Sequence, residues 1–187
     1  MPMKKSSAST LILVISALVG ILYFTYMPSA SYTRNAQRLL DDIEKGVKTH
    51  NSASIGPMMH FIFDDDAKIT LQVYMPPVPG QKGQMFMQNF DKIGFLSYTN
   101  RLLAVLQDYA FTGHVDSLTL NSGRKSGTMN FTAKVETNNL RTNNLAARFH
   151  YTGVATCTAE LTFVDPQQPP HFHSLTCELH LSGGMVR

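Results

Sequence analysis

Two histidines separated by one residue, His171 and His173, form the most metal-like pattern in the sequence. Side chains two positions apart on a strand point to the same side, and this pair shares parity with Leu175 and Cys177. We therefore expect both rings at the inner surface of the sheet. A zinc or copper site needs one or two further ligands, and spacing places none beside the pair. His171 and His173 are thus candidate ligands only, and we predict neither a metal site nor a cofactor.

A second candidate for chemistry is the pair His114 and Asp116, which share one face of a predicted strand. An imidazole beside a carboxylate could transfer protons inside a pocket, with Tyr74, Tyr98 or Tyr109 as a further donor. A partly exposed strand edge is the simpler interpretation, and the chain carries none of the motifs GxSxG, CxxC or HExxH. We therefore predict no catalytic residue and favour a non-enzymatic role.

Three consecutive aspartates, Asp64 to Asp66, offer carboxylates to a cation. A calcium loop needs ligands at alternating positions together with a glycine, and no such pattern continues from this run. We interpret the three aspartates as a solvated turn that precedes a strand.

Two cysteines lie on two predicted strands, Val154 to Val164 and Phe172 to Leu181, which alternate between apolar and polar residues. A hairpin folded about Gln167 places Cys157 directly opposite Cys177, at a separation that suits a disulfide. Two reduced core thiols are the alternative. We favour the disulfide, which would close a loop of about 20 residues and contribute about 3 kcal/mol.

Methionine-rich apolar stretches are the candidates for protein contacts, because flexible Met side chains adapt to varied partners. They also fill gaps in a core, which remains the alternative. The candidate interaction residues are Met58, Met59, Met85, Phe86 and Met87.

The N-terminus carries an uncharged apolar stretch after Lys4 and Lys5. Residues 8–27 would cross a bilayer core of about 30 Å as one helix. A signal peptide cleaved near Ser29 to Ser31 is the alternative, but the stretch is long and Pro28 would occupy position −3. We predict an anchor in residues 1–28 and an exported domain in residues 29–187. The predicted location is the inner membrane, single-pass, with the domain in the periplasm.

The remaining pattern predicts an α+β domain. Ser31 to Thr49 and Asp91 to Tyr109 have amphipathic helical patterns, with Asp91 as N-cap of the second. Strands are predicted at Lys68 to Met75, Phe111 to Leu120 and Thr128 to Glu136, ahead of the cysteine-bearing pair. Asn51 to Pro57 is predicted as a linker and Pro76 to Gly83 as a long loop. The expected order is helix, strand, helix and four antiparallel strands, and we expect the strands to form a curved, antiparallel sheet.

That element order over residues 31–182 resembles the nuclear-transport-factor-2-like (NTF2-like) or cystatin-like cone superfamily. The resemblance implies a curved sheet wrapped around a helix, with a pocket at the wide end. Its members include isomerases, dehydratases, ligand binders and assembly domains. A single span before such a domain also resembles the VirB8-type scaffold of type IV secretion systems, although no specific motif matches.

The N-terminal sequence is similar to the first helix of type IV pilins in Ser9 to Ile12, Gly20 to Leu22, Pro28 and Tyr32 to Gln37. It departs from them because no glycine precedes Ser9 and no glutamate follows among the first apolar residues. A pilin-like subunit would have one continuous helix from about Ser9 to Thr49.

Three functions remain open. The first is a membrane-anchored scaffold domain of an envelope assembly such as a secretion or conjugation system, which binds protein partners or itself. The alternatives are a small-ligand-binding or enzymatic NTF2-like domain and a pilin-like filament subunit. Nucleic acid is not a predicted partner, because the net charge is only +3 and the basic residues are scattered.

Overall fold

The computed structural model describes residues 16, 29–48, 52–76, 83–140, 148–165 and 167–186. Residues 29–48 are helical, and we call them the 29–48 helix. The other elements follow in the order α2 (Ser52–Ile62), β1 (Phe63–Met75), β2 (Gln84–Asp91), α3 (Lys92–Val105), β3 (Leu106–Leu120), β4 (Ser126–Leu140), β5 (Arg148–Thr162) and β6 (His171–Val186).

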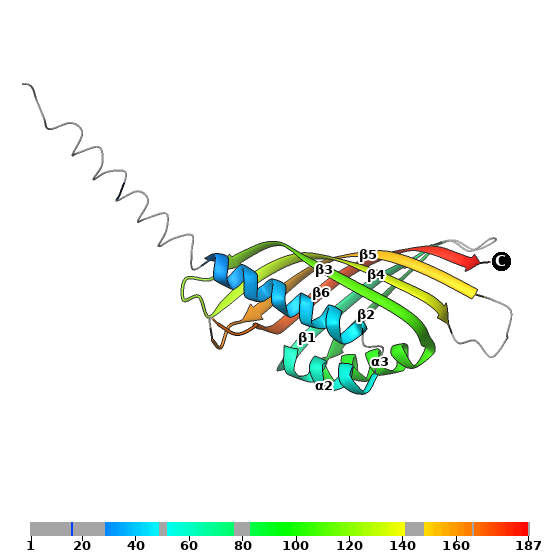
Figure 1. The fold of residues 1–187 in the computed structure, drawn as a ribbon, viewed down its shortest axis with the longest axis horizontal. Coiled ribbons are helices and arrows are strands. Elements are labelled where there is room, and N and C mark those ends of the chain that lie inside the picture. The colour runs from blue at the N-terminus through cyan, green and yellow to red at the C-terminus, as the bar shows by residue number, and fades with distance from the viewer. Residues whose placement is uncertain are drawn as a thin grey trace, which may run out of the picture.

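All six of these strands form one sheet in the order β2-β1-β6-β5-β4-β3 (Figure 1). The strands β3 to β6 form an antiparallel meander, as predicted. The expectation of a wholly antiparallel sheet is wrong, because β1 pairs with β6 in parallel. Two strands can pair in parallel only if the chain between them crosses over to the other end of the sheet. The local polar–apolar pattern of a strand does not show whether such a crossover exists.

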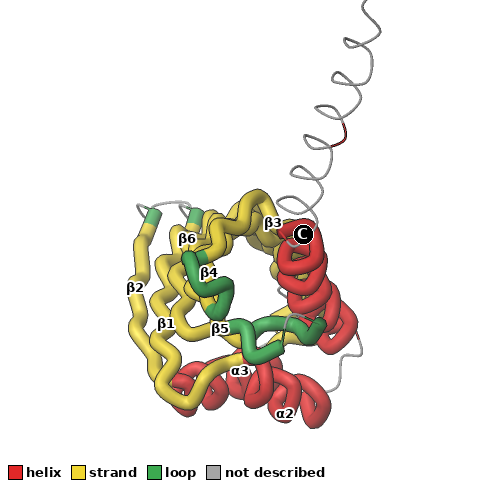
Figure 2. The backbone as a smooth tube through the Cα atoms, turned by 90° about the vertical axis from the view of Figure 1, so that its left-hand side faces the viewer, coloured by secondary structure: helices red, strands yellow, loops and turns green. Residues whose placement is uncertain are grey.

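The sheet curves around the interior of the domain, and the three helices close the remaining sides (Figure 2). The 29–48 helix buries Ala36, Leu39 and Leu40 on its inner stripe. Gly113 of β3 lets this helix approach, since a Cβ at that position would lie 3.1 Å from Leu40. The Gln37 amide then donates to the Gly113 carbonyl and accepts from the Val115 N–H, both at 2.9 Å, which fixes the helix to β3.

Aromatic side chains fill the core at the junction of β1, β4 and β6. Phe172 is 1% exposed, and its ring centroid lies 5.2 Å from that of Phe63 and 6.4 Å from that of Phe131. Phe95 of α3 packs edge-on against Phe63 at 5.5 Å. These rings connect the parallel strand pair to the meander, because they come from elements far apart in the chain.

Several predicted elements differ from the structure, and the strands β1 and β3 to β6 extend beyond their predicted bounds. Residues 52–57 belong to α2 rather than to a linker, and α2 contains Pro57. The second predicted helix ends at Val105, where β3 begins, although Asp91 caps it by accepting from the Gly94 N–H at 2.7 Å. Strand β2 was not predicted, because its sequence lacks polar–apolar alternation and its residues are nearly all exposed.

No helix among the described residues is long and apolar enough to cross a bilayer. The predicted span of residues 8–27 lies outside the described residues, apart from Ser16. The continuous pilin-like helix and the boundary after residue 28 fall on the same part of the chain, so they stay predictions.

Candidate functional site

The concave side of the sheet and the helices line a partly open apolar cavity of about 280 Å³. Its wall is built from inward-facing residues of the meander and β1, together with side chains of the 29–48 helix, α2 and α3. No charged residue and no histidine lines it among the described residues. The wall includes Leu40, Ile43, Met58, Met59, Phe63, Phe95, Leu102, Phe111, Phe131, Ala133, Ala155, Phe172 and Leu179.

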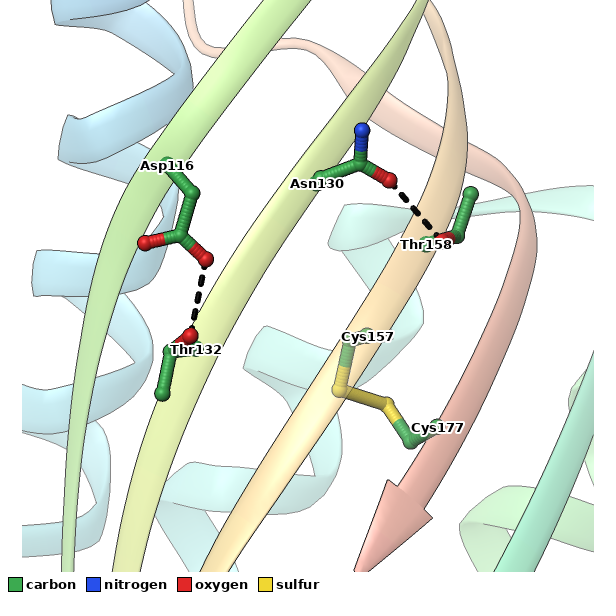
Figure 3. Close-up of a disulfide and its surroundings, with 6 residues drawn as sticks. All are labelled: Asp116, Asn130, Thr132, Cys157, Thr158 and Cys177. Carbon is green, nitrogen blue, oxygen red and sulfur yellow. Dashed lines mark hydrogen bonds between the residues drawn. A yellow bond between two sulfur atoms is a disulfide. The ribbon is translucent and has the colours of Figure 1, made fainter.

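The predicted disulfide is present and forms part of this wall. Cys157 of β5 and Cys177 of β6 are cross-strand partners with Cα atoms 4.1 Å apart, and the bond joins the two strands (Figure 3). Both residues are buried and line the cavity. The register that the hairpin symmetry predicted is therefore confirmed at this position.

The candidate interaction residues separate into two groups. Met58 and Met59 of α2 are half-buried and line the cavity, so the core interpretation holds for them. Met85, Phe86 and Met87 of β2 are 59%, 47% and 56% exposed. Because β2 is an edge strand of the sheet, these three side chains remain available for a partner.

The His114–Asp116 pair lies on the outside of the cone and does not line the cavity. Both residues are exposed, and Asp116 accepts a hydrogen bond of 2.7 Å from the Thr132 hydroxyl of β4 (Figure 3). His114 and Asp116 therefore do not form an acid–base pair inside a pocket, because both side chains lie outside the cavity. Among the three tyrosines considered as donors, only Tyr98 lines the cavity.

A second site of converging polar groups forms where β1 and β6 begin. The expectation that His171 and His173 face the inner surface is wrong, because a register shift after Glu160 turns Phe172 inward instead. A larger irregularity affects the β1–β6 pair, where Phe63 pairs with Phe172 but Lys68 pairs with Ser174. Residues 64–67 therefore bulge opposite a single residue of β6.

This bulge brings two aspartates to the two histidines. Asp64 lies between the rings: its Oδ1 is 3.4 Å from Nδ1 of His171, and its Oδ2 is 3.4 Å from Nδ1 of His173. The Oδ1 atom of Asp66 is 3.7 Å from the same His173 nitrogen. The Thr162 hydroxyl of β5 donates to Asp64 Oδ2 at 2.9 Å. Donor atoms of Asp64, Asp66 and His173 all lie within 4.8 Å of one another.

Asp65, between these two aspartates, points elsewhere and pairs with Lys92 at 2.8 Å. The hydrogen bond from Lys92, followed by its charge, holds the pKa of Asp65 below its usual value. This pair joins the bulge to the start of α3, so the bulge is held from both sides.

No protein-family model and no curated protein sequence matches the chain. Solved structures do resemble it. A hexachlorocyclohexane dehydrochlorinase, type 2, is 17% identical with a TM-score of 0.52, and the match covers 80% of this chain and 87% of that one. A conserved protein from Planctomyces limnophilus is 9% identical with a TM-score of 0.51, covering 79% and 95%. A protein from Kribbella flavida is 10% identical with a TM-score of 0.51, covering 82% and 95%.

At these identities the likeness concerns the fold alone, and it agrees with the α+β fold with a curved sheet that the element order predicted. The finer resemblances, to a VirB8-type scaffold and to a type IV pilin, stay predictions.

Proposed function

We propose that this NTF2-like domain binds a small apolar molecule in its cone. The observation that carries the proposal is the cavity of about 280 Å³, whose described wall holds no charged residue and no histidine. Ligand sites in proteins are mostly apolar concavities with a few polar groups that orient the ligand. Here Gln72, Tyr98 and Thr99 are the polar side chains of the wall, so an occupant would be held mainly by burial.

The size of the cavity limits the ligand class. An apolar protein cavity of about 150 Å³ binds benzene and stays free of water. A cavity of about 280 Å³ therefore suits a molecule about twice that size, such as a two-ring aromatic compound or a short branched hydrocarbon chain. Met58 and Met59 help such a fit, because flexible thioether side chains adjust to irregular shapes.

Binding is favoured over catalysis. General acid–base chemistry needs a titratable group within hydrogen-bond reach of the ligand. The His114–Asp116 pair is outside the cone, and Tyr98 is the only titratable residue of the described wall. The dehydrochlorinase activity of one structural relative is therefore not extended to this chain.

Filling the cavity is expected to abolish ligand binding. Ala155 faces the cavity, and Ala155→Phe would place a phenyl ring in the ligand's space. Naphthalene at ten times its dissociation constant should stabilise the wild-type protein by about 1.4 kcal/mol, and should leave the variant unchanged. The measurement is thermal unfolding of the full-length protein at one fixed detergent concentration, with and without naphthalene.

Ala110→Phe is the matched control, because Ala110 is exposed on β3 and lies outside the cavity wall. This variant should respond to naphthalene as the wild type does. Equal stabilisation of both variants would mean that naphthalene acts elsewhere, and no stabilisation of the wild type would remove the support for an apolar ligand.

We also propose that the domain works outside the cytosol, attached to the membrane through residues 8–27. The uncharged length of that stretch supports an anchor. The Cys157–Cys177 disulfide supports an oxidising compartment, because such bonds form and persist there. An envelope location in this orientation would give the domain access to lipophilic molecules at the membrane surface.

The second candidate function is self-association, which would suit a scaffold in an envelope assembly. Strand β2 pairs only with β1 among the described strands, and residues 84–90 carry no charge. Natural edge strands are commonly protected by charges or proline, and an unprotected edge pairs readily with another strand. Antiparallel pairing of β2 with β2 of a second copy is self-complementary and places Met85, Phe86 and Met87 in the contact.

Phe86→Lys is expected to dissociate this dimer. A lysine from each copy near the two-fold axis would introduce repulsion and the cost of burying a charge. Sedimentation velocity in detergent should show a dimer for the wild type and a monomer for Phe86→Lys. Ile93→Lys is the control, because Ile93 is 76% exposed on α3 and should leave the dimer intact. A dimer that persists in Phe86→Lys would rule out the β2 edge as the contact.

A further inference from the structure

We propose that Asp64, Asp66 and His173 form a binding site for a divalent transition-metal ion, with Zn²⁺ as the preferred ion. The site lies at the β1–β6 junction, outside the apolar cavity, so it is independent of the proposed ligand binding. It combines two carboxylates from the β1 bulge with one imidazole from β6.

The distances between the donor atoms support a metal rather than direct pairing. A charge-assisted hydrogen bond between imidazolium and carboxylate measures about 2.7–2.9 Å. The Asp64–His173 and Asp66–His173 atom pairs are longer, at 3.4 and 3.7 Å. Two ligands that each lie about 2.0–2.1 Å from a tetrahedral zinc ion are separated by about 3.3–3.4 Å. The Asp64–His173 spacing therefore matches an edge of a coordination tetrahedron, and the Asp66–His173 spacing is slightly longer than such an edge.

Neighbouring groups hold the first ligand in position. The Thr162 hydroxyl donates to Asp64 Oδ2, which fixes the plane of the carboxylate. His171 lies 3.4 Å from the other oxygen of the same carboxylate, where it can orient Asp64 without being a ligand itself. Hydrogen-bonded neighbours of this kind align metal ligands and commonly change the affinity 10- to 100-fold.

The ligand types decide which ion suits the site. Nitrogen together with carboxylate oxygen suits Zn²⁺ and neighbouring transition metals, whereas Ca²⁺ takes six to eight oxygen ligands. Three protein ligands leave a fourth position for water. The half-exposed His173 and the exposed Asp66 give solvent access to that position.

Such a site would join strands that lie far apart in sequence. Asp64 and Asp66 lie near the start of β1, and His173 lies near the start of β6, more than a hundred residues later in the chain. A bound ion would therefore link the parallel pair at its weakest point, where the ladder is interrupted between Phe63 and Lys68. Metal binding should stabilise the folded domain, because the separated ligands of the unfolded chain form no such site.

The test is isothermal titration of the full-length protein, prepared without a polyhistidine tag, with ZnCl₂ in a non-chelating buffer. The wild type should bind one Zn²⁺ per chain and should unfold at a higher temperature when zinc is present. His173→Ala should lose saturable binding and the thermal shift. Asp66→Asn, which keeps the shape and removes a charged ligand, should weaken binding, and His171→Ala, which removes a neighbour of Asp64, should weaken it by about 10- to 100-fold.

His180→Ala is the matched control, because His180 is an exposed histidine on the same strand that lies beside a carboxylate, Glu178. It should bind zinc as the wild type does. Both His173 and Asp66 are largely at the surface, so their variants should remain folded, which far-ultraviolet circular dichroism verifies. The proposal would be overturned if the wild type showed no saturable binding. It would also be overturned if His173→Ala and His180→Ala bound zinc with equal affinity, and the residues would then form only histidine–carboxylate ion pairs.

Discussion

Replacing Phe172 with alanine is expected to lower the free energy of unfolding by about 3–5 kcal/mol. The side chain is 1% exposed and packs against Phe63 of β1 and Phe131 of β4. Its removal loses the burial of a whole ring and leaves a void that the surrounding strands can fill only in part. Reversible urea unfolding, followed by far-ultraviolet circular dichroism, measures the change.

Phe61→Ala is the control for this effect, because Phe61 is 72% exposed on α2. The same chemical truncation at the surface should change the free energy of unfolding by no more than about 0.5 kcal/mol. Similar losses in the two variants would mean that Phe172 is not the centre of the aromatic core.

Removing the disulfide is expected to cost about 3 kcal/mol of stability. The bond joins residues 20 positions apart, and without it the unfolded chain regains the entropy of that loop. The double variant Cys157→Ala/Cys177→Ala also avoids placing unpaired hydroxyl groups in an apolar wall, as serines would. The midpoint of urea unfolding, compared with that of the oxidised wild type, reports the loss.

Reduction separates the cross-link from the packing of the sulfur atoms. A thiol reductant should destabilise the wild type by nearly the same amount, because it opens the loop and leaves both sulfurs in place. The same reductant should have no effect on the double variant. The entropic explanation would be contradicted if the reductant opened the bond in the wild type but left its free energy of unfolding unchanged.

Local patterns predicted much of the fold. The alternation of Val154 to Val164 and Phe172 to Leu181, with a short turn between them, was enough to place Cys157 opposite Cys177. A hairpin register depends on residues close in sequence, so it can be read from the pattern. The amphipathic helix over Ser31 to Thr49 was predicted for the same reason, because its repeat is set within one element, and the structure buries its Ala36, Leu39 and Leu40.

The candidate sites were harder to predict. Asp64 to Asp66 were interpreted as a turn, and His171 and His173 as lacking further ligands. In the structure Asp64 and Asp66 meet the two histidines, whereas Asp65 pairs with Lys92. The parallel pairing of β1 with β6, in an irregular register, brings these residues together. The spacing of residues in the sequence does not predict this pairing. The lining of the apolar cavity could not be predicted from the sequence either, because its wall combines residues from the helices and the strands.

By itself, the sequence determined the α+β class, the meander and the cysteine register, because these depend on periodicity and on neighbours within a hairpin. The order of its elements also predicted the curved-sheet α+β fold, with which the likeness to solved structures agrees. Only the tertiary structure decided that β1 lies beside β6, that a bulge turns Phe172 inward and His173 outward, and that the sheet and helices line an apolar cavity. The physical reason is that contacts between distant segments depend on how the curved sheet closes, which local alternation does not encode.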